Sequence, residues 1–283
     1  MSAAVLIVGA GGQLGEAMTS RLGRQPGVVA VTRSELDVTD ASAVRALVAR
    51  VAPRVIINCA AYTDVDRSEQ EPLAALQVNA MAVRALARAA DEGDATLVHY
   101  STDFVFDGRT DRPYSETDPV NPRGTYATSK LLGEWLAMET PRHYVLRVES
   151  LFGGARAHSS VDKILASLRA GAPVRAFVDR AVSPSFVDDV IGATVALLDR
   201  GAPFGLYHCV NTGWTNWAGL SREIARLIGR PDAPIEEIRM ADAGLLANRP
   251  LFAALSNAKL LAAGVEMPTW QDALARYVTR VGS

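Results

Sequence analysis

A glycine-rich turn close to the start of the chain restricts the possible folds more than any other feature. The apolar run Ala3–Val8 is typical of a buried strand, and residues 13–23 have the spacing of a helix. The turn between them, GAGGQLG at 9–15, has glycines at 9, 12 and 15. Such a turn lets backbone approach a pyrophosphate, which the free N–H groups at the helix N-terminus bind. We therefore expect a dinucleotide here, held by Gly9, Gly12, Gln13 and Leu14.

Apolar and helical segments alternate through the first 150 residues. Strand-like runs lie at 28–31, 55–60, 96–101 and 144–148, and helical patterns lie at 41–51, 69–92 and 125–139. This alternation predicts the α/β class, with a doubly wound parallel sheet of the Rossmann kind. The pattern loosens later, where we expect a smaller mixed α/β C-terminal part that binds the substrate. The predicted cofactor domain spans 1–150 plus about 183–212, and the substrate domain about 151–182 plus 213–283.

Charge and cysteine content exclude several classes of function. The 283 residues include 29 basic and 31 acidic ones, and no basic run supports a nucleic-acid or membrane partner. Cys59 and Cys209 are the only cysteines, so we expect no disulfide framework and a cytoplasmic protein. The four histidines lack the spacing of metal ligands, and no metal site is predicted.

The residue after the second predicted strand bears on the choice of cofactor. An acid at this place favours NAD, whereas a basic residue accommodates the 2′-phosphate of NADP. The sequence here is Val31-Thr32-Arg33-Ser34, which favours NADPH and leaves NADH open as the second choice. A solvent-exposed arginine without a ligand is the alternative explanation of Arg33. Asp37 and Val38 would then border the adenine.

A tyrosine and a lysine stand four residues apart in a segment with helical spacing, at Tyr126 and Lys130. The two side chains then lie on one face of the helix. A nearby ammonium group favours the phenolate, so it is expected to lower the pKa of the Tyr126 phenol. This pair can protonate the oxygen of a ketone during its reduction. The pattern is common by chance, and its significance depends on the residues around it.

The residues between the glycine turn and this pair complete a recognisable series. They include Asn58-Cys59-Ala60-Ala61-Tyr62, Asn79 and the block Ser101-Thr102-Asp103-Phe104-Val105-Phe106-Asp107-Gly108. The chain resembles the extended short-chain dehydrogenase/reductases, and among them most of all the dTDP-4-dehydrorhamnose reductase family. The resemblance is dense from residue 5 to residue 150 and thinner afterwards.

The resemblance implies a role for each matching residue. Thr102 would hydrogen-bond the substrate carbonyl, Tyr126 would supply the proton, and Lys130 would hold the nicotinamide ribose. Further cofactor contacts would come from Cys59, Ala60, Ala61, Asn79 and Tyr100. The implied reaction is reduction of the 4-keto group of a nucleotide-activated 6-deoxy-4-ketohexose, and a homodimer is one expectation. Taken singly, Thr102 could equally end a strand and Asn79 could brace a helix.

The chain departs from the family pattern where the substrate is expected. Ser150 stands at the place of a tryptophan, so an aromatic wall would have to come from Phe152 or Trp214. Arg180 replaces a glutamine and would bind a diphosphate in bidentate fashion, unless it is a solvated charge. Asp103, Phe104 and Arg249 are the other expected substrate contacts. Glu16, Asp188 and Asp189 lie near the family's reported metal site, but their match is inexact.

Two other functions stay open at this point. One is a non-catalytic NADP-binding regulatory subunit, similar to the beta subunit of methionine adenosyltransferase, and the missing tryptophan favours it. The other is a reductase or epimerase of another nucleotide sugar. Intact Thr102, Tyr126 and Lys130 favour an enzyme.

Overall fold

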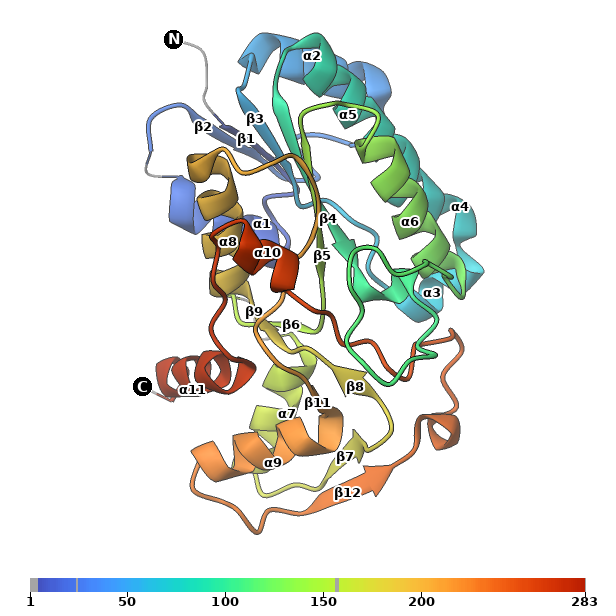
Figure 1. Ribbon diagram of the computed structural model, residues 1–283, viewed down its shortest axis with the longest axis vertical. Helices are drawn as coiled ribbons and strands as arrows, with labels where there is room; N and C mark the ends of the chain where they lie inside the picture. The colour runs from blue at the N-terminus through green and yellow to red at the C-terminus, as the bar shows by residue number, and fades with distance from the viewer. Residues whose placement is uncertain (1–4, 24, 156–157, 283) are drawn as a thin grey trace. The chain divides into compact units, whose positions relative to one another are not determined.

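A computed structural model describes residues 5–23, 25–155 and 158–282, which form two compact units (Figure 1). The first unit comprises the described residues of Met1–Val105 together with Pro122–Arg147 and Gly201–Tyr207. The second comprises the described residues of Phe106–Asn121, Val148–Arg200 and His208–Ser283. Each unit has its own apolar core and is described separately below.

The first unit is built on a six-stranded sheet. Its strands are β1 (Val5–Val8), β2 (Val28–Val31), β3 (Val55–Asn58), β4 (Thr96–Thr102), β5 (His143–Val148) and β10 (Gly205–His208). Their order is β10-β5-β4-β3-β1-β2, and the pairs β1–β2, β1–β3 and β3–β4 are parallel. The order reverses at β1, since β2 and β3 lie on opposite sides of it. In open α/β sheets, ligands bind beyond the carboxyl ends of the strands at such a switch point.

Helices cover this sheet, and apolar side chains fill the space between them. The helices of the unit are α1 (Gln13–Leu22), α2 (Ala41–Val51), α3 (Val65–Gln70), α4 (Pro72–Leu76), the π-helical turn η1 (Gln77–Met81), α5 (Ala82–Glu92), the short 3₁₀ helix η2 (Asp103–Val105) and α6 (Thr125–Ala137). Buried residues of β1, β3 and β4 pack against α2 and α5, among them Leu6, Ile56, Leu97, Leu47 and Leu86. The doubly wound α/β fold predicted from the alternating pattern is therefore confirmed.

The helix predicted over 69–92 is wrong in detail, because the structure divides this segment. The first helix, α3, ends at Gln70, and Pro72 begins α4 at a position where the missing N–H of proline costs nothing. The π-helical turn η1 then precedes α5. Gly133 of α6 crosses this turn so closely that a Cβ atom there would lie 2.1 Å from the Asn79 carbonyl oxygen.

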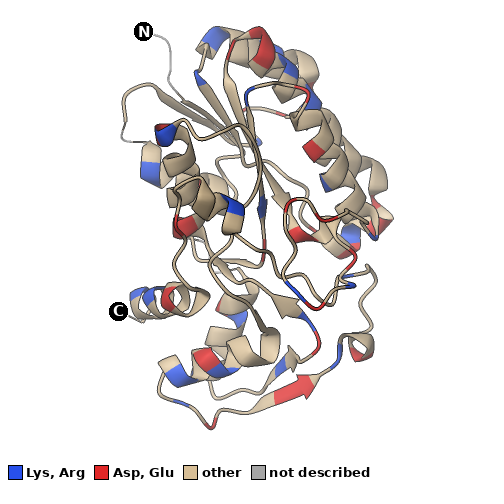
Figure 2. Ribbon diagram, viewed as in Figure 1, with Lys and Arg blue, Asp and Glu red and all other residues tan. Residues whose placement is uncertain are grey.

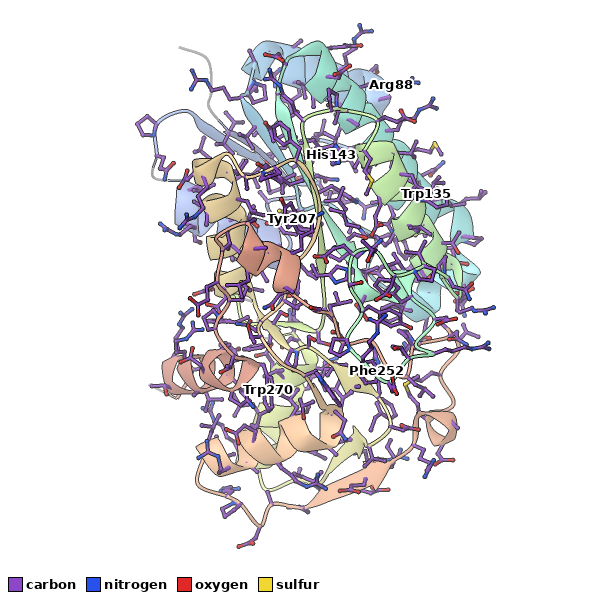
Figure 3. The ribbon with its side chains drawn as sticks, in the orientation of Figure 1. Arg88, Trp135, His143, Tyr207, Phe252 and Trp270 are labelled. Atoms are coloured by element: carbon purple, nitrogen blue, oxygen red, sulfur yellow. The ribbon has the colours of Figure 1, made fainter. Side chains whose placement is uncertain are left out.

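The second unit joins short strand pairs to helices. Its elements are β6 (Leu151–Phe152), α7 (Ser160–Arg169), β7 (Val174–Phe177), β8 (Ala181–Val182), β9 (Ser185–Phe186), α8 (Val187–Arg200), β11 (Thr215–Asn216), α9 (Trp217–Leu227), β12 (Ile235–Ile238), η3 (Met240–Ala243), α10 (Ala258–Ala262) and α11 (Trp270–Arg280). The strands pair as β6–β9, β7–β12 and β8–β11. Phe152, Phe186 and Tyr277 meet in its core with Trp217 and Trp270, the second of which is labelled in Figure 3.

The boundaries of the units differ from those expected from the sequence. Residues 106–121, 148–150, 183–200 and 208–212 belong to the second unit. The first of these segments is held there by backbone contacts, since Tyr114 bridges Leu255 and the Phe252 N–H donates to the Gly108 carbonyl. Such pairings join residues far apart in the sequence, and no local pattern announces them.

Charged residues are distributed over both units. Figure 2 shows basic and acidic residues interspersed along the helices, in line with the near balance of 29 basic and 31 acidic residues. Among the helices that the structure describes, none is long and apolar enough to cross a membrane.

Candidate active site

The glycine turn lies at the switch point of the sheet and is shaped for a close approach. Gly9 has φ +79°, and a Cβ atom there would lie 2.6 Å from the Ala60 backbone nitrogen. A Cβ atom on Gly15 would lie 2.1 Å from the Gly9 carbonyl oxygen. Gly12 is the N-cap residue of α1, and no side-chain hydrogen bond caps the helix there. The first turn of α1, with Gln13 and Leu14, thus has no side-chain cap, and a helix N-terminus of this kind suits a phosphate.

The end of β2 holds an acid that the sequence analysis missed. Glu35 accepts hydrogen bonds from the Thr32 N–H and hydroxyl, both at 2.8 Å, and these bonds lower the pKa of its carboxyl. Arg33 is exposed beside this turn. Asp37 accepts from the N–H and hydroxyl of Thr39, which lowers its pKa, while Val38 packs partly against the core. Arg33 therefore stays the predicted contact for a 2′-phosphate, with Glu35 close to it in the chain.

Two buried asparagines shape the loop that follows β3. The Asn58 carboxamide oxygen accepts the Ala60 N–H at 3.1 Å. The Asn79 carboxamide binds both backbone groups of Tyr62, at 2.8 and 3.0 Å, and also donates to Ser129 Oγ at 3.0 Å. Asn79 therefore ties this loop to α6. A direct contact of Asn79 with the cofactor stays a prediction, as it does for Ala60 and Ala61.

Cys59 lies in the same loop, and its backbone continues the pairing of β3 with β1 through an N–H bond to Val8. Burial raises the pKa of its thiol to about 12. The thiol is thus uncharged at neutral pH, which suits the apolar wall of a pocket better than nucleophilic chemistry.

Helix α6 presents Tyr126 and Lys130, and its first turn is capped from another element. The N-cap residue Gly124 has no side chain to serve as a cap and has φ +96°. Glu69 of α3 takes this role, since its carboxylate accepts the Thr125 N–H at 2.8 Å and the Thr125 hydroxyl at 3.0 Å. A negative charge at a helix N-terminus is favourable. Glu69 therefore fixes the helix one residue before Tyr126.

Lys130 is buried and directed at the backbone of β4. Its Nζ donates to the Tyr100 carbonyl at 2.6 Å, and the residue is 2% exposed. Burial lowers the pKa of its amine to about 8, because a charged group is costly to remove from water. Tyr100 therefore holds Lys130 through its backbone carbonyl, and its predicted contact with the cofactor stays a prediction.

Tyr126 is surrounded by residues of β4 and η2. Its ring meets the Phe104 ring edge-on, with 5.4 Å between centroids. Burial raises the pKa of the phenol to about 12, while a hydrogen bond with Thr102 acts to lower it and the charge of Asp103 to raise it. The expectation that Lys130 lowers this pKa is therefore not met. The phenol is protonated at neutral pH, which is the form required for giving a proton to a ketone oxygen.

Thr102 and Asp103 stand beside the phenol at the carboxyl end of β4. The Thr102 hydroxyl donates to Asp103 Oδ1 at 3.0 Å and accepts the Phe104 N–H at 3.3 Å. Thr102 and Asp103 are only 4% and 3% exposed. The three predicted catalytic residues, Thr102, Tyr126 and Lys130, thus all lie in the first unit, with Tyr126 beside Thr102 and with Lys130 bonded to the same strand through the Tyr100 carbonyl.

Comparisons with known proteins identify the family of the chain. A family model described as "RmlD substrate binding domain" matches residues 3–283. The chain belongs to this family. It is 36% identical over 277 residues to a dTDP-4-dehydrorhamnose reductase of Streptomyces griseus, covering 95% of this chain and 91% of the relative. It is 35% identical over 279 residues to a protein of the same name from Mycobacterium tuberculosis, covering 96% and 91%.

Solved structures of this family have the same fold as the chain. A dTDP-4-dehydrorhamnose reductase from Clostridium acetobutylicum superposes with a TM-score of 0.93 at 29% identity, covering 99% of each chain. One from Bacillus anthracis, in complex with NADP, gives the same TM-score and identity and covers 99% of this chain and 100% of that one. The resemblance to the reductase family stated from the motifs is therefore confirmed.

Thr102, Asp103 and Phe104 lie in the first unit, whereas the other expected substrate contacts fall in the second, and one of these is corrected. Phe152 is 0% exposed and stacks on Phe186, so it belongs to the core and presents no surface to a substrate. Trp214, the other aromatic candidate, is 47% exposed and lies 5.1 Å from Phe252 (labelled in Figure 3). Ser150 has φ +45°, and its carbonyl accepts the Ser185 N–H.

The two predicted arginine contacts lie in different settings. Arg180 is 9% exposed, so it is not the solvated surface charge that the sequence left open. Arg249 donates to the Ala247 carbonyl at 2.9 Å. Contacts of Arg180 and Arg249 with a diphosphate stay predictions.

Two carboxylates near the family's metal region are paired with arginines. Asp188 lies 2.8 Å from Arg280, and Asp189 lies 2.7 Å from Arg276 and accepts from Asn211. Within the ranges that the structure covers, no group of three or more His, Cys, Asp or Glu residues is arranged to hold a metal ion.

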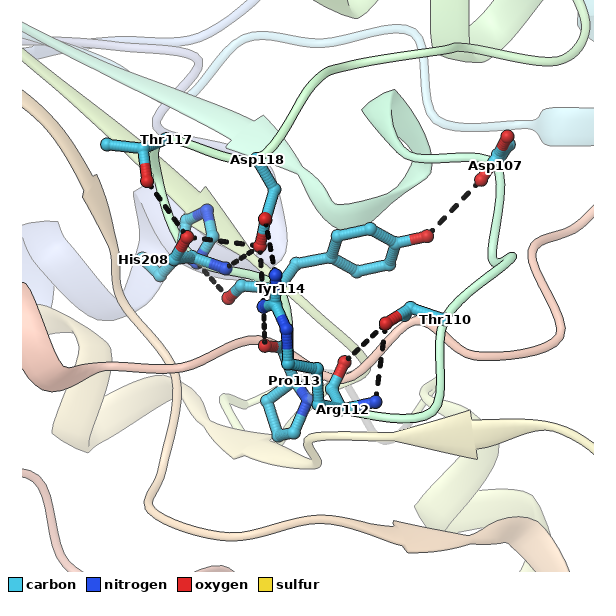
Figure 4. Close-up of polar contacts among 9 residues, drawn as sticks. Asp107, Thr110, Arg112, Pro113, Tyr114, Thr117, Asp118 and His208 are labelled. Carbon is cyan, nitrogen blue, oxygen red and sulfur yellow. Dashed lines mark hydrogen bonds and ion pairs between the residues drawn. The ribbon is translucent and has the colours of Figure 1, made fainter.

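A hydrogen-bonded loop follows the catalytic block in the sequence and lies in the second unit (Figure 4). Asp118 pairs with Arg112 at 2.7 Å and accepts the Ser115 N–H at 2.7 Å. Tyr114 donates to Asp107, and its carbonyl bonds to His208 Nδ1 at 3.0 Å. Sequence reasoning assigned these residues no role. Their pairing depends on β10 and on the C-terminal segment, which lie more than ninety residues away.

Proposed function

We propose that this protein uses NADPH to reduce the 4-keto group of a nucleotide-activated 6-deoxy-4-ketohexose, as a dTDP-4-dehydrorhamnose reductase. The observation that carries the proposal is the cluster of Thr102, protonated Tyr126 and buried Lys130 in the unit that holds the glycine turn. Relatives named for this reaction, 35–36% identical over nearly the whole chain, support it.

The residues at the switch point fit a dinucleotide. Gly9 and Gly15 let the turn pack against the Ala60 backbone and against its own first residue, where a Cβ atom would clash, and α1 begins without a side-chain cap at Gly12. The pyrophosphate would lie on this helix N-terminus, and Lys130 would reach the nicotinamide ribose. When bound, the nicotinamide supplies the hydride.

The side chains of the first unit then act on the ketone oxygen. Thr102 and Tyr126 hydrogen-bond this oxygen as negative charge develops on it, and Tyr126 gives it the proton. The raised pKa of Tyr126 keeps that proton available at neutral pH. Thr102 must turn its hydroxyl from Asp103 to donate to the substrate.

A substitution of the proposed acid tests the reaction. Tyr126→Phe is expected to lower turnover of a dTDP-4-keto-6-deoxyhexose by roughly 10²–10⁴-fold, because the proton donor is lost, while NADPH still binds. NADPH consumption measures the turnover, and cofactor fluorescence measures the binding of NADPH. Tyr207→Phe is the control, since it removes a tyrosine hydroxyl that donates to the Pro203 carbonyl and that has no role in the proposed reaction. Wild-type turnover of Tyr126→Phe would remove Tyr126 as the acid.

The choice of NADPH over NADH rests on Arg33 and on the NADP bound to the relative from Bacillus anthracis. If Arg33 meets the 2′-phosphate, Arg33→Ala should weaken NADPH binding at least about tenfold and leave NADH binding nearly unchanged, since one charge-assisted hydrogen bond contributes about 1.5–3 kcal/mol. Fluorescence titration with both cofactors measures this. An equal loss for NADPH and NADH would defeat the assignment.

The non-catalytic alternative makes the opposite prediction in the same assay. A regulatory subunit would bind NADPH tightly and consume none of it with any member of a panel of dTDP-, UDP-, GDP- and CDP-linked 4-ketosugars. Turnover of a different nucleotide sugar from that panel would identify a related reductase. We also expect a homodimer in a reducing compartment, and both cysteines are free, in keeping with such a compartment.

A further inference from the structure

Helix α6 carries three polar side chains along one face, and only two of them take part in the mechanism above. Tyr126, Lys130 and Glu134 follow each other at intervals of four residues, so they form one stripe. Glu134 is 1% exposed. An ionised carboxylate is costly to bury unless it is paired, so its presence one turn beyond Lys130 requires an explanation.

Glu134 is held by two strands of the sheet at once. Its Oε1 accepts the Ser101 hydroxyl at 2.5 Å and Arg147 Nε at 2.8 Å. Its Oε2 accepts an Arg147 terminal nitrogen at 2.7 Å. Arg147 is 3% exposed, so this is a buried, bidentate ion pair between α6 and β5, joined to β4 through Ser101.

The bonds made by Ser101 connect this ion pair to the catalytic residues. Ser101 lies in β4 between Tyr100, whose carbonyl accepts Lys130, and Thr102, whose side chain hydrogen-bonds Tyr126. Three consecutive strand residues therefore meet three consecutive positions of the helix stripe. The carboxylate of Glu134 fixes the distance between α6 and the carboxyl end of β4.

We propose that Glu134 is a positioning residue that acts on the reaction through Lys130, by holding the ammonium group charged and in place against β4. Ser101 and Arg147 orient the Glu134 carboxylate for this role. The inference rests on the proposed reduction for its importance to turnover, but the effect on Lys130 is a property of the protein alone.

Among the charged groups around Lys130, Glu134 is the carboxylate that favours the ammonium charge of Lys130. Glu134 acts to raise the pKa of Lys130 against the lowering caused by burial. From β4, His99 faces the amine with its pKa well below the usual value, because of burial and the charge of Lys130, so it is neutral. Asp103 acts on the Tyr126 phenol instead.

The remaining charged groups near α6 are engaged elsewhere. Glu69 of α3 caps the start of the helix, and Arg84 of α5 pairs with Glu139 beyond its end. Arg147 of β5 faces Glu134. The turn η1 and helix α4 contribute no ionisable side chain.

The pKa of Lys130 can be measured directly, because the chain has only three lysines, Lys130, Lys163 and Lys259. Labelling with [ε-¹³C]lysine gives one NMR signal for each, and Lys130→Met identifies the first. The wild-type signal of Lys130 should titrate near pH 8. In Glu134→Gln/Arg147→Met, its midpoint should move about one pH unit lower.

The paired substitution avoids a buried arginine without a partner, which would threaten folding in Glu134→Gln alone. Glu134→Asp is the second variant; it keeps the charge but withdraws it by one methylene, and a smaller fall is expected. Lys163 and Lys259 are exposed and serve as internal controls, whose midpoints should not move.

Turnover gives the independent readout. The alkaline limb of kcat/KM against pH should move in parallel with the NMR midpoint of Lys130. A midpoint that is the same in wild type and in both variants would overturn the proposal, whatever the activity. If the Lys130 midpoint shifts as expected in the variants but the wild-type protein reduces no ketosugar, the proposed function would be contradicted and the role of Glu134 would stand.

Discussion

At the level of single residues, burial moves the pKa values of the two central groups in opposite directions. The Tyr126 phenol is raised to about 12 and the Lys130 amine is lowered to about 8, because in each case the uncharged form is favoured. For reduction, the first effect is useful, since it keeps the proton on the phenol. The second is a cost, because burial disfavours the charged form of Lys130 in the folded protein.

Because the charged form of Lys130 is costly to bury, we expect the stability of the protein to depend on pH in an unusual way. Its folded pKa lies below the unfolded value of 10.5, so between about pH 8 and 10.5 the unfolded chain binds more protons. The contribution of Lys130 is therefore least favourable below pH 8 and improves as the pH rises through that window. Lys130→Met should raise the free energy of unfolding at pH 7 by up to about 3 kcal/mol, less the lost bond to Tyr100.

Urea unfolding at pH 7 and pH 10 checks this prediction. The gain in stability of Lys130→Met should be nearly gone at pH 10, while its turnover should be low throughout. Lys163→Met is the matched control, since Lys163 is exposed on α7. If Lys130→Met is less stable than wild type, and by the same amount at pH 7 and at pH 10, the buried charge of Lys130 is not costly.

Single residues also show how far sequence reasoning reaches. The spacing of Tyr126 and Lys130 indicates a shared helix face, and the structure places both there. The target of Lys130 is a carbonyl of β4, which depends on how α6 packs and leaves no trace in the spacing. Phe152 was misassigned for a similar reason, because the partner that buries it, Phe186, is set by the pairing of β6 with β9.

At the level of elements, a glutamate from α3 supports the catalytic helix. The carboxylate of Glu69 bonds both groups of Thr125 at the start of α6, where Gly124 offers no cap. Glu69→Gln is expected to destabilise the protein by about 1 kcal/mol, as other losses of an N-cap do. It should also lower kcat several-fold, because Tyr126 is the next residue of the helix.

Thermal unfolding and steady-state kinetics measure the two effects. Glu139→Gln is the control at the far end of α6, where the carboxylate is 46% exposed and lies 3.8 Å from Arg84. It should leave both quantities nearly unchanged. If Glu69→Gln behaves like this control, the cap has no part in positioning Tyr126.

The elements that were predicted well are those with a strong local period. Strands β1 to β5 follow apolar runs, and helix α2 has the bounds 41–51 that the sequence indicated. The segment 69–92 was predicted less well, because its apolar period continues through Pro72 and the π-helical turn η1, where the helix is interrupted. The period reports which face is buried, but it does not show where a helix breaks.

At the level of the whole molecule, the proposed ligands have different expected sites in the two units. The glycine turn and α6, with Lys130, belong to the first unit, whereas Arg180, Trp214 and Arg249 belong to the second. Hydrogen exchange can therefore test the two halves of the proposed function separately. NADPH alone should slow exchange at 9–15 and 58–62, because it binds the folded state and orders these backbone segments.

Addition of dTDP should slow exchange around 179–182 and 247–252 of the second unit, which contain Arg180, Arg249 and Phe252, the neighbour of Trp214. The core segment 160–169 of the same unit serves as the reference, since it contains none of the expected contacts. The protection by NADPH should be lost in a Gly12→Val variant, while the protection by dTDP should persist. If dTDP instead protects only the glycine turn, that turn is a general nucleotide site, and the assignment of substrate binding to the second unit fails.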